Sequence, residues 1–304
     1  MVIDIGIDRP GRESGMAPRK AGPANGHRVL RSLTCGVNRI CLVSGDNGDV
    51  AVPYLDHPRP TAFAHRGGAA YNPENSWPAF EYAVKLGYAY LETDARSTSD
   101  GALLSFHDAA LDRVTDHTGQ VAKMTYKQVS AARIGGSEPI PLMEDLLGTF
   151  GELRFNVDLK DSGTIEPLAR VLKRTGAWDR VCVTSFSGKR LVAARKILDR
   201  PVCTAVTPAA IAAVRYAGFS GKQMAARLAR SGAQCAQVPR QIATREFIRR
   251  SHELGLHVHV WTLNTREEIE RALDLGADGV MTDDVVLLRD ILTERGQWNP
   301  RVAV

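Results

Sequence analysis

Two acidic side chains stand two positions apart in a run typical of a buried strand. Glu92 and Asp94 lie within Tyr90–Ala95, and because side chains alternate along a strand, both point to one face. Like charges on one face repel, and burying them is costly without compensation. A divalent cation supplies that compensation, and oxygen ligands favour Mg²⁺ or Ca²⁺ over Zn²⁺. Taken alone, the pair is equally typical of an exposed edge.

A short connection follows this strand and brings a histidine near the acids. Six residues join it to the next apolar run, Ala102–Phe106, which is too few for a helical crossover. The Asp-Gly pair at 100–101 predicts a hairpin turn. With a two-residue turn, Asp94 lies opposite His107, and opposed residues share a face. The sequence therefore predicts an antiparallel hairpin that places Glu92, Asp94 and His107 on one surface.

A histidine and an arginine follow the first predicted strand, Thr61–Ala64. His65 is at a strand end, where a lone histidine is more often structural. Arg66 beside it is a planar donor suited to a phosphate, and the two glycines that follow let the backbone approach a ligand closely. Glu74, just before the next predicted helix, is a candidate for supporting the residues that contact the ligand.

Another acid and base stand at the end of a later run. Asp158 lies near the end of the predicted strand Arg154–Leu159 and Lys160 follows it, and the two share a face because they are two positions apart. An acid and a base at this spacing are common on strands, so the pair is informative only if the fold brings it to the same mouth as His65.

An aromatic residue lies within a further run, His257–Leu263. Trp261 is either a core residue or a stacking platform at the mouth of a site. His257 and His259 alternate with valines, and we expect them to pack or face solvent rather than to bind a ligand.

The residues after Pro58 alternate short apolar runs with amphipathic helical stretches. Repeated strand–helix units imply parallel strands and right-handed crossovers, and their extent fits the ~250 residues of one barrel. We predict an α/β fold, a TIM-type (β/α)₈ barrel with a local antiparallel hairpin. A doubly wound sheet is less favoured because no Gly-rich dinucleotide loop follows the first strand. Predicted strands are Thr61–Ala64, Tyr90–Ala95, Ala102–Phe106, Arg154–Leu159, Val181–Ser185, Val202–Val206, Gln234–Val238, His257–Leu263 and Gly279–Thr282, and predicted helices are Trp77–Leu86, Ile165–Arg174, Lys189–Leu198, Thr244–Leu254 and Arg266–Leu275.

Residues 1–58 differ from the rest of the chain. They are rich in Gly, Pro and Arg at first and have no helical period, which predicts a flexible N-terminal extension. The barrel domain is expected to span residues 59–304.

Composition excludes several classes of protein. Of the 304 residues, 44% are hydrophobic and 24% charged, with a net charge of +5, as in an ordinary globular chain. The basic residues are dispersed, whereas a nucleic-acid binder shows a basic stripe with aromatics. No apolar run approaches the ~18 residues of a membrane span, and no signal for an oligomeric state is present.

The five cysteines indicate a reducing compartment. Their number is odd and no CxxC occurs, so a cytoplasmic location is expected. Cys182 and Cys203 lie in apolar runs and are predicted to be small buried hydrophobes.

Together the chemical motifs resemble the glycerophosphodiester phosphodiesterase family over about residues 60 to 290. The ordered set is specific although each motif alone is weak. The matching segments are His65-Arg66-Gly67, Pro73-Glu74-Asn75-Ser76, Glu92-x-Asp94, Thr98-x-Asp100-Gly101, His107-Asp108, Leu111-Asp112-Arg113-x-Thr115, Asp158-x-Lys160, Trp261-Thr262-Leu263-Asn264 and Ala277-Asp278-Gly279-Val280-x-Thr282-Asp283.

The resemblance implies a role for each site residue. His65 and His107 would form the acid–base pair, and Arg66 and Lys160 would bind the phosphate. Trp261 would line the alcohol side of the pocket. One divalent cation, Mg²⁺ or Ca²⁺, would be held by the carboxylates of Glu92, Asp94 and Asp158.

The activity implied is hydrolysis of small glycerophosphodiesters to sn-glycerol 3-phosphate and an alcohol. One departure matters: Asp158 stands where the family usually has Glu. A related branch, the spider-toxin-like phospholipases D, has Asp-x-Lys here, so a lyase acting on lysolipids or sphingolipids is the alternative. A non-catalytic barrel that binds a phosphorylated ligand is a third hypothesis, disfavoured because His65, Lys160 and the other central residues are all present.

Overall fold

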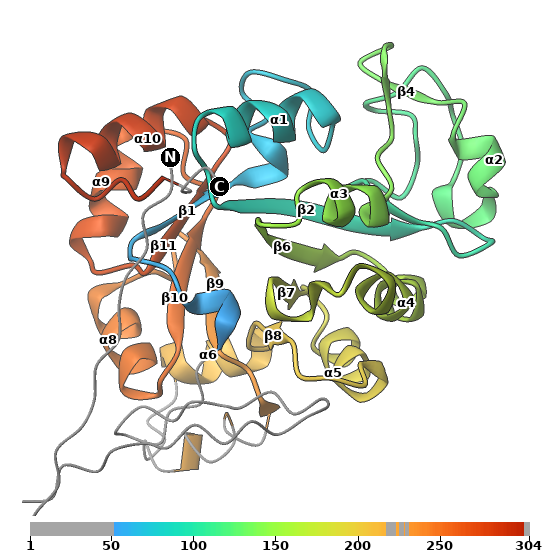
Figure 1. The fold of residues 1–304 in the computed structure, drawn as a ribbon. Helices are drawn as coiled ribbons and strands as arrows, with labels where there is room; N and C mark the ends of the chain where they lie inside the picture. The colour runs from blue at the N-terminus through green and yellow to red at the C-terminus, as the bar shows by residue number, and fades with distance from the viewer. Residues whose placement is uncertain (1–51, 217–222, 225–227, 229–230, 301–304) are drawn as a thin grey trace, which may run out of the picture. The chain divides into compact units, whose positions relative to one another are not determined.

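Eight parallel strands form a cylinder surrounded by helices (Figure 1). The computed structural model describes residues 52–216, 223–224, 228 and 231–300. The predicted extension therefore lies outside the described residues, apart from its last few positions. Among the described residues, no helix is long and apolar enough to cross a membrane.

The strand order follows the predicted barrel. Neighbouring strands run β8-β7-β6-β2-β1-β11-β10-β9, and every pair in this path is parallel. The circle is completed by one bridge between Ala205 and Cys235. This arrangement confirms the barrel and excludes the open doubly wound sheet. The strands are β1 Thr61–Ala64, β2 Tyr90–Ser97, β6 Arg154–Leu159, β7 Val181–Thr184, β8 Cys203–Thr204, β9 Cys235–Pro239, β10 His257–Trp261 and β11 Gly279–Thr282.

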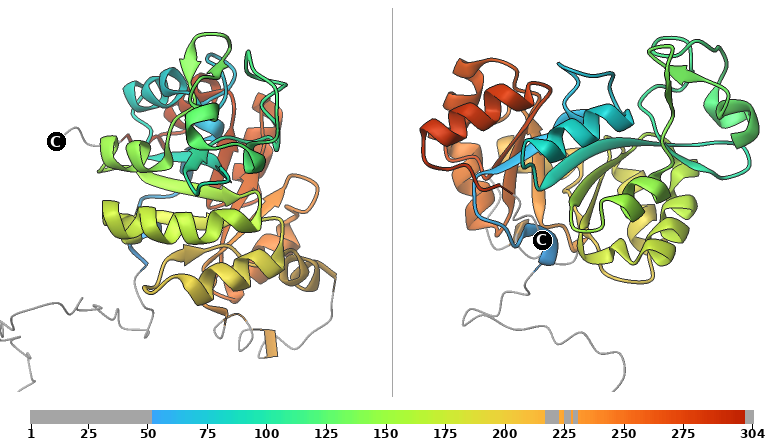
Figure 2. Two further views of the ribbon diagram at one scale, coloured as in Figure 1. Left: turned by 90° about the vertical axis from the view of Figure 1, so that its right-hand side faces the viewer. Right: turned by 45° about the horizontal axis from the view of Figure 1, so that its top comes forward.

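Helices connect the strands and cover the outside of the cylinder (Figures 1 and 2). Ser76, Thr244 and Thr265 cap three of them by accepting backbone N–H groups, which satisfies free donors of the first turn. The five predicted helices are confirmed with ends within one residue. The described helices of this layer are α1 Trp77–Lys85, α3 Met143–Thr149, α4 Ile165–Thr175, α5 Gly188–Ile197, α6 Pro208–Tyr216, α8 Arg245–Glu253, α9 Arg266–Asp274 and α10 Val285–Glu294.

Strand alternation divides the barrel into an outer apolar layer and a mixed interior. Leu91 and Val157 point outward to the helices. Phe63 and Tyr90 point inward near the base, together with the buried Tyr54 of the short helix η1 (Pro53–Leu55). The acids predicted for the site also occupy inward positions, closer to the carboxyl ends of the strands, where barrel enzymes carry their active sites.

A small subdomain is inserted after β2. It comprises β3 (Leu103–Ser105), η3 (Val121–Lys123), α2 (Tyr126–Val129) and the two-stranded sheet of β4 (Arg133–Ile134) and β5 (Glu138–Pro139). Its apolar cluster includes Leu104, Phe106, Leu111, Val121 and Ile134. Figure 2 shows this subdomain projecting beyond the carboxyl end of β2.

The predicted hairpin exists, but its predicted register is wrong by one residue. Ser97 pairs with Leu103 and Ala95 with Ser105, and Phe106 N–H donates to the carbonyl of Asp94 at 2.9 Å. Three residues rather than two form the loop, because Gly101 adopts a φ of +83° and adds a position to the turn. Because β3 ends at Ser105, His107 lies outside the strand. The alternation of side chains along β3 therefore does not determine the direction in which His107 points.

A buried carboxylate ties the barrel together near its base. Asp278 accepts Val258 N–H at 2.7 Å and pairs with His252 at 2.7 Å and Arg59 at 2.6 Å. Burial alone would raise the pKa of Asp278, but these three donors outweigh it and lower the pKa. Because the folded-state pKa is below the unfolded one, the stabilisation is present at neutral pH and is lost as the pH falls through the acidic range.

We therefore expect Asp278→Asn to lower the free energy of unfolding by about 1.5–3 kcal/mol at neutral pH, the range for hydrogen bonds to a charged group. The loss should be nearly complete down to the ordinary pKa of an aspartate, about 4, and should shrink as the pH falls further, through the lowered pKa of Asp278. Urea denaturation at neutral pH and at pH ~3 measures it. Asp274→Asn is the control, since Asp274 pairs with Arg295 on the surface, and should change stability by less than ~1 kcal/mol. Equal losses in the two variants would refute the assignment.

Candidate active site

His65 and Arg66 begin the site at the carboxyl end of β1. They lie in the short helix η2 (His65–Gly67), where Arg66 adopts a φ of +50°. This left-handed conformation is uncommon for a residue with a side chain and is found where surrounding contacts enforce it. Here the Arg66 N–H donates to Glu92 Oε2 at 2.9 Å, so the turn is held against the first acid of β2.

Three carboxylates are buried together. Glu92, Asp94 and Asp158 expose 4%, 1% and 5% of their surface, and Asp94 is directly paired with Asp158 across β2 and β6. Burial raises the pKa of Glu92 to about 7 and also raises the pKa of Asp158. Asp158 Oδ1 is buried and has no hydrogen-bond partner among the described residues. Burial thus favours the neutral forms of Glu92 and Asp158, and one buried oxygen of the cluster remains unsatisfied.

Lys160 and Arg66 supply the cationic groups nearest to these acids. Lys160 Nζ lies 2.8 Å from Asp94 Oδ1 and 2.6 Å from Asp158 Oδ2. Arg66 Nε lies 3.1 Å from Asp94 Oδ2, and Arg66 Nη1 donates to Glu74 at 3.0 Å. Both cationic side chains thus contact the acids, and both also line the cavity described below.

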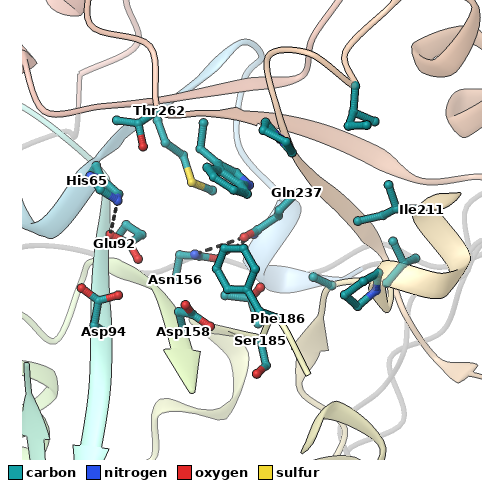
Figure 3. Close-up of a pocket in the computed structure, with 18 of the residues that line it drawn as sticks. His65, Glu92, Asp94, Asn156, Asp158, Ser185, Phe186, Ile211, Gln237 and Thr262 are labelled. Atoms are coloured by element: carbon teal, nitrogen blue, oxygen red, sulfur yellow. Dashed lines mark hydrogen bonds and ion pairs between the residues drawn. The ribbon is translucent and has the colours of Figure 1, made fainter. Parts of the chain in front are cut away.

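His65 is oriented by a carboxylate from the far end of the chain. Its Nδ1 lies 2.7 Å from Asp283 Oδ1, and its Nε2 lies 3.8 Å from Glu92 Oε2 (Figure 3). Asn264 holds the other oxygen of Asp283 by donating at 2.8 Å. Burial alone would lower the pKa of His65, but Glu92 and Asp283 outweigh it and raise the pKa.

His107 has a matching arrangement. Its Nδ1 lies 2.6 Å from Asp108 Oδ1, and Arg113 donates to both oxygens of Asp108. The hydrogen bond from Arg113, helped by His107, lowers the pKa of Asp108 to about 2. Arg113 also donates to Glu74 at 2.7 Å. Glu74 therefore contacts both Arg66, which follows His65, and Arg113, which holds the Asp108 beside His107.

These residues surround one cavity of about 400 Å³. Its polar end is lined by the two histidines, the three acids, Arg66 and Lys160, so the structure brings all the predicted residues except Glu74 to its wall. Its other end is apolar, and there the exposed Phe186 packs edge-to-face on Trp261 at 5.5 Å (Figure 3). The apolar lining includes Phe186, Val206, Pro208, Ile211, Tyr216, Ile242 and Trp261.

Several supporting residues were named in the sequence only as motif positions. Asp283 orients His65, Asp108 orients His107, and Asn75 donates to Asp94 at 2.9 Å. The signal for Asp108 was its adjacency to His107. Asp283 gave no such signal, because 218 residues separate it from His65.

Comparisons with known proteins identify the family. The Glycerophosphoryl diester phosphodiesterase family matches residues 65–287. The probable glycerophosphodiester phosphodiesterase 2 of Mycobacterium tuberculosis is 35% identical over 260 residues, which cover 84% of this chain and 98% of that protein.

Solved structures show the same fold. A glycerophosphoryl diester phosphodiesterase structure from Silicibacter pomeroyi has a TM-score of 0.72 at 23% identity and covers 82% of this chain and 100% of that one. An Oleispira antarctica phosphodiesterase, solved in complex with the product sn-glycerol-3-phosphate, has a TM-score of 0.68 at 22% identity, with 77% and 97% covered. The chain therefore belongs to the glycerophosphodiester phosphodiesterase family of phosphodiester hydrolases.

Proposed function

We propose that this chain hydrolyses small glycerophosphodiesters to sn-glycerol 3-phosphate and an alcohol. The observation that carries the proposal is the pair of histidines on one cavity, each held through Nδ1 by its own aspartate. The names of the related proteins support the substrate class, and the Oleispira antarctica structure contains the corresponding product.

The three acids supply the donor chemistry for one divalent cation, but their oxygens do not all lie within 4.8 Å of one another, so a bound ion would draw them together. Glu92, Asp94 and Asp158 offer only oxygen donors, which suit Mg²⁺ or Ca²⁺. The buried Asp158 Oδ1, which lacks a hydrogen-bond partner in the described part of the chain, is free to bind an ion. When bound, the cation would neutralise charge on the phosphodiester and on the transition state. Asp158 stands where the family usually has Glu, and its side chain is one methylene shorter. Its other oxygen, Oδ2, contacts Lys160.

The histidines would move the protons. Each Nδ1 faces an aspartate, which leaves the Nε2 of that ring for the substrate. One ring would take a proton from the attacking water and the other would protonate the leaving alkoxide. Arg66 and Lys160 would bind the phosphate oxygens, and Trp261 would line the side of the alcohol.

A lyase acting on lysolipids is the second candidate, and the cavity itself favours it. Beyond the polar end, Ile211, Tyr216 and Phe186 form an apolar wall, and both Tyr216 and Phe186 are largely exposed. Such a wall would suit an acyl chain. In that reaction a substrate hydroxyl, rather than water, attacks the phosphorus and gives a cyclic phosphate.

Replacing either histidine should impair the chemical step. We expect His65→Ala and His107→Ala each to lower kcat on glycerophosphocholine by at least ~10²-fold, the usual size of an acid–base contribution. His117→Ala is the matched control, because His117 forms a similar pair with Asp116 on the exposed surface, and should keep its activity. Near-normal kcat in either cavity variant would remove that histidine from the mechanism.

Removing the cation should abolish activity. We expect EDTA treatment to eliminate turnover, because three buried acids would then oppose the bound phosphodiester. Mg²⁺ or Ca²⁺ should restore it after the chelator is removed. Full activity in protein shown by elemental analysis to be free of divalent cations would contradict the assigned ligands.

The products separate the two candidate reactions. Phosphorus NMR of glycerophosphocholine turnover should show the phosphomonoester as the stable product. A cyclic phosphate that accumulates, with faster turnover of a lysolipid than of glycerophosphocholine, would favour the lyase instead.

A further inference from the structure

Three cysteines lie together inside the barrel, away from the groups that would perform the hydrolysis. Cys182, Cys203 and Cys235 come from the adjacent strands β7, β8 and β9, and all three are buried. Their Sγ atoms lie within 4.8 Å of one another, and the Cys182–Cys235 pair is 3.7 Å apart. Sulfurs bound tetrahedrally at ~2.3 Å from one zinc lie about 3.8 Å apart, so the cluster is close to the size of a zinc site.

Among the described residues, only the three sulfurs form a group whose atoms all lie within 4.8 Å of one another. His259, which the sequence predicts to pack or to face solvent, is the candidate fourth donor and would have to approach them. His259 on β10 is 1% exposed, and its Nδ1 has no hydrogen-bond partner among the residues the structure describes. Burial raises the pKa of Cys182 and of Cys203, whereas hydrogen bonds from these two thiols and from His259 lower the pKa of Cys235. A buried ring nitrogen without a partner is costly, and an ion bound to Nδ1 would remove that cost.

The surroundings suit bound thiolates. Gln237 Nε2 lies 3.8 Å from Cys235 Sγ and 4.0 Å from Cys182 Sγ. The buried hydroxyl of Tyr54 also lacks a hydrogen-bond partner in the described part of the chain, and Tyr54 lies in the same buried cluster as the three cysteines. Arg195, which donates to Thr204 Oγ1 at 2.9 Å, adds a positive charge near Cys182 and Cys235.

The cluster lies where the barrel has the least backbone pairing. β8 contains only two residues and meets β9 through the single Ala205–Cys235 bridge. An ion held by sulfurs of β7, β8 and β9 would link the strands on the two sides of this weakly paired junction. Binding free energy at such a site contributes directly to folding.

We propose that Cys182, Cys203 and Cys235, with His259, bind one structural Zn²⁺ that closes the barrel between β8 and β9. Each thiol that binds the ion loses its proton to solvent. This site is distinct from the oxygen site of Glu92, Asp94 and Asp158, because thiolate and imidazole ligands select a softer ion. It does not depend on the proposed substrate.

The full chain, purified from cells grown with added zinc and dialysed against excess Mg²⁺ to displace zinc from the oxygen site, tests this directly. We expect about one zinc per chain by elemental analysis. Replacing zinc by Co²⁺ should give the near-ultraviolet thiolate-to-cobalt band and the visible bands of tetrahedral cobalt. Wild-type protein that binds no ion, binds cobalt without the thiolate band, or has a mass two hydrogens lower because of a disulfide would overturn the proposal.

Variants assign the ligands. Cys203→Ser should weaken zinc binding by at least ~10²-fold, whereas His259→Asn should cost less, at least ~10-fold. The control is the double variant Cys35→Ser/Cys41→Ser, which alters the two cysteines outside the described residues and should keep one zinc. Equal zinc content in the control and in folded Cys203→Ser would overturn the proposal, and the cobalt spectrum of the wild type decides the matter if that variant does not fold.

Discussion

The site depends on three carboxylates buried at one end of a parallel barrel. Asp94 and Asp158 are paired across neighbouring strands, and Glu92 lies one inward position below Asp94. Burial, with a smaller contribution from mutual repulsion, raises the pKa of Glu92 and of Asp158. Lys160 and Arg66 compensate Asp94 and lower its pKa despite its burial. One buried oxygen of Asp158 still has no hydrogen-bond partner among the described residues, so the cluster retains an acceptor for the cation proposed above.

The barrel makes this arrangement possible because it joins distant segments at one rim. His65 follows β1, whereas the Asp283 that orients it follows β11, and these two strands are neighbours in the closed sheet. The second histidine comes from the subdomain inserted after β2. Arg113 of that subdomain contacts Glu74, which also binds Arg66. The two histidines therefore belong to one connected network of hydrogen bonds and ion pairs, which runs from His65 through Glu92 and the Arg66 backbone N–H to Glu74 and Arg113, although they reach the cavity from different parts of the fold.

Much of this could be predicted from sequence because strand ends and motifs are local. The bounds of Thr61–Ala64, Arg154–Leu159 and Gly279–Thr282 were predicted as found. The register of the hairpin was predicted wrongly. It depends on whether the loop has two residues or three, with Gly101 as the third, and backbone conformations of similar energy allow both. His107 still reaches the cavity, since β3 ends before it. The partnership of His65 with Asp283 is a consequence of barrel closure, which no local pattern encodes.

The stability of the metal-free protein tests most directly whether a cation compensates the buried acids. Thermal unfolding of the wild type and of Asp158→Asn should be compared in EDTA and with added Mg²⁺ or Ca²⁺. If the account is correct, the asparagine variant is at least as stable as the wild type in EDTA, because a repelling charge is gone, and the cation raises Tm for the wild type but not for the variant. A variant that is less stable in EDTA and is still stabilised by the cation would contradict the account.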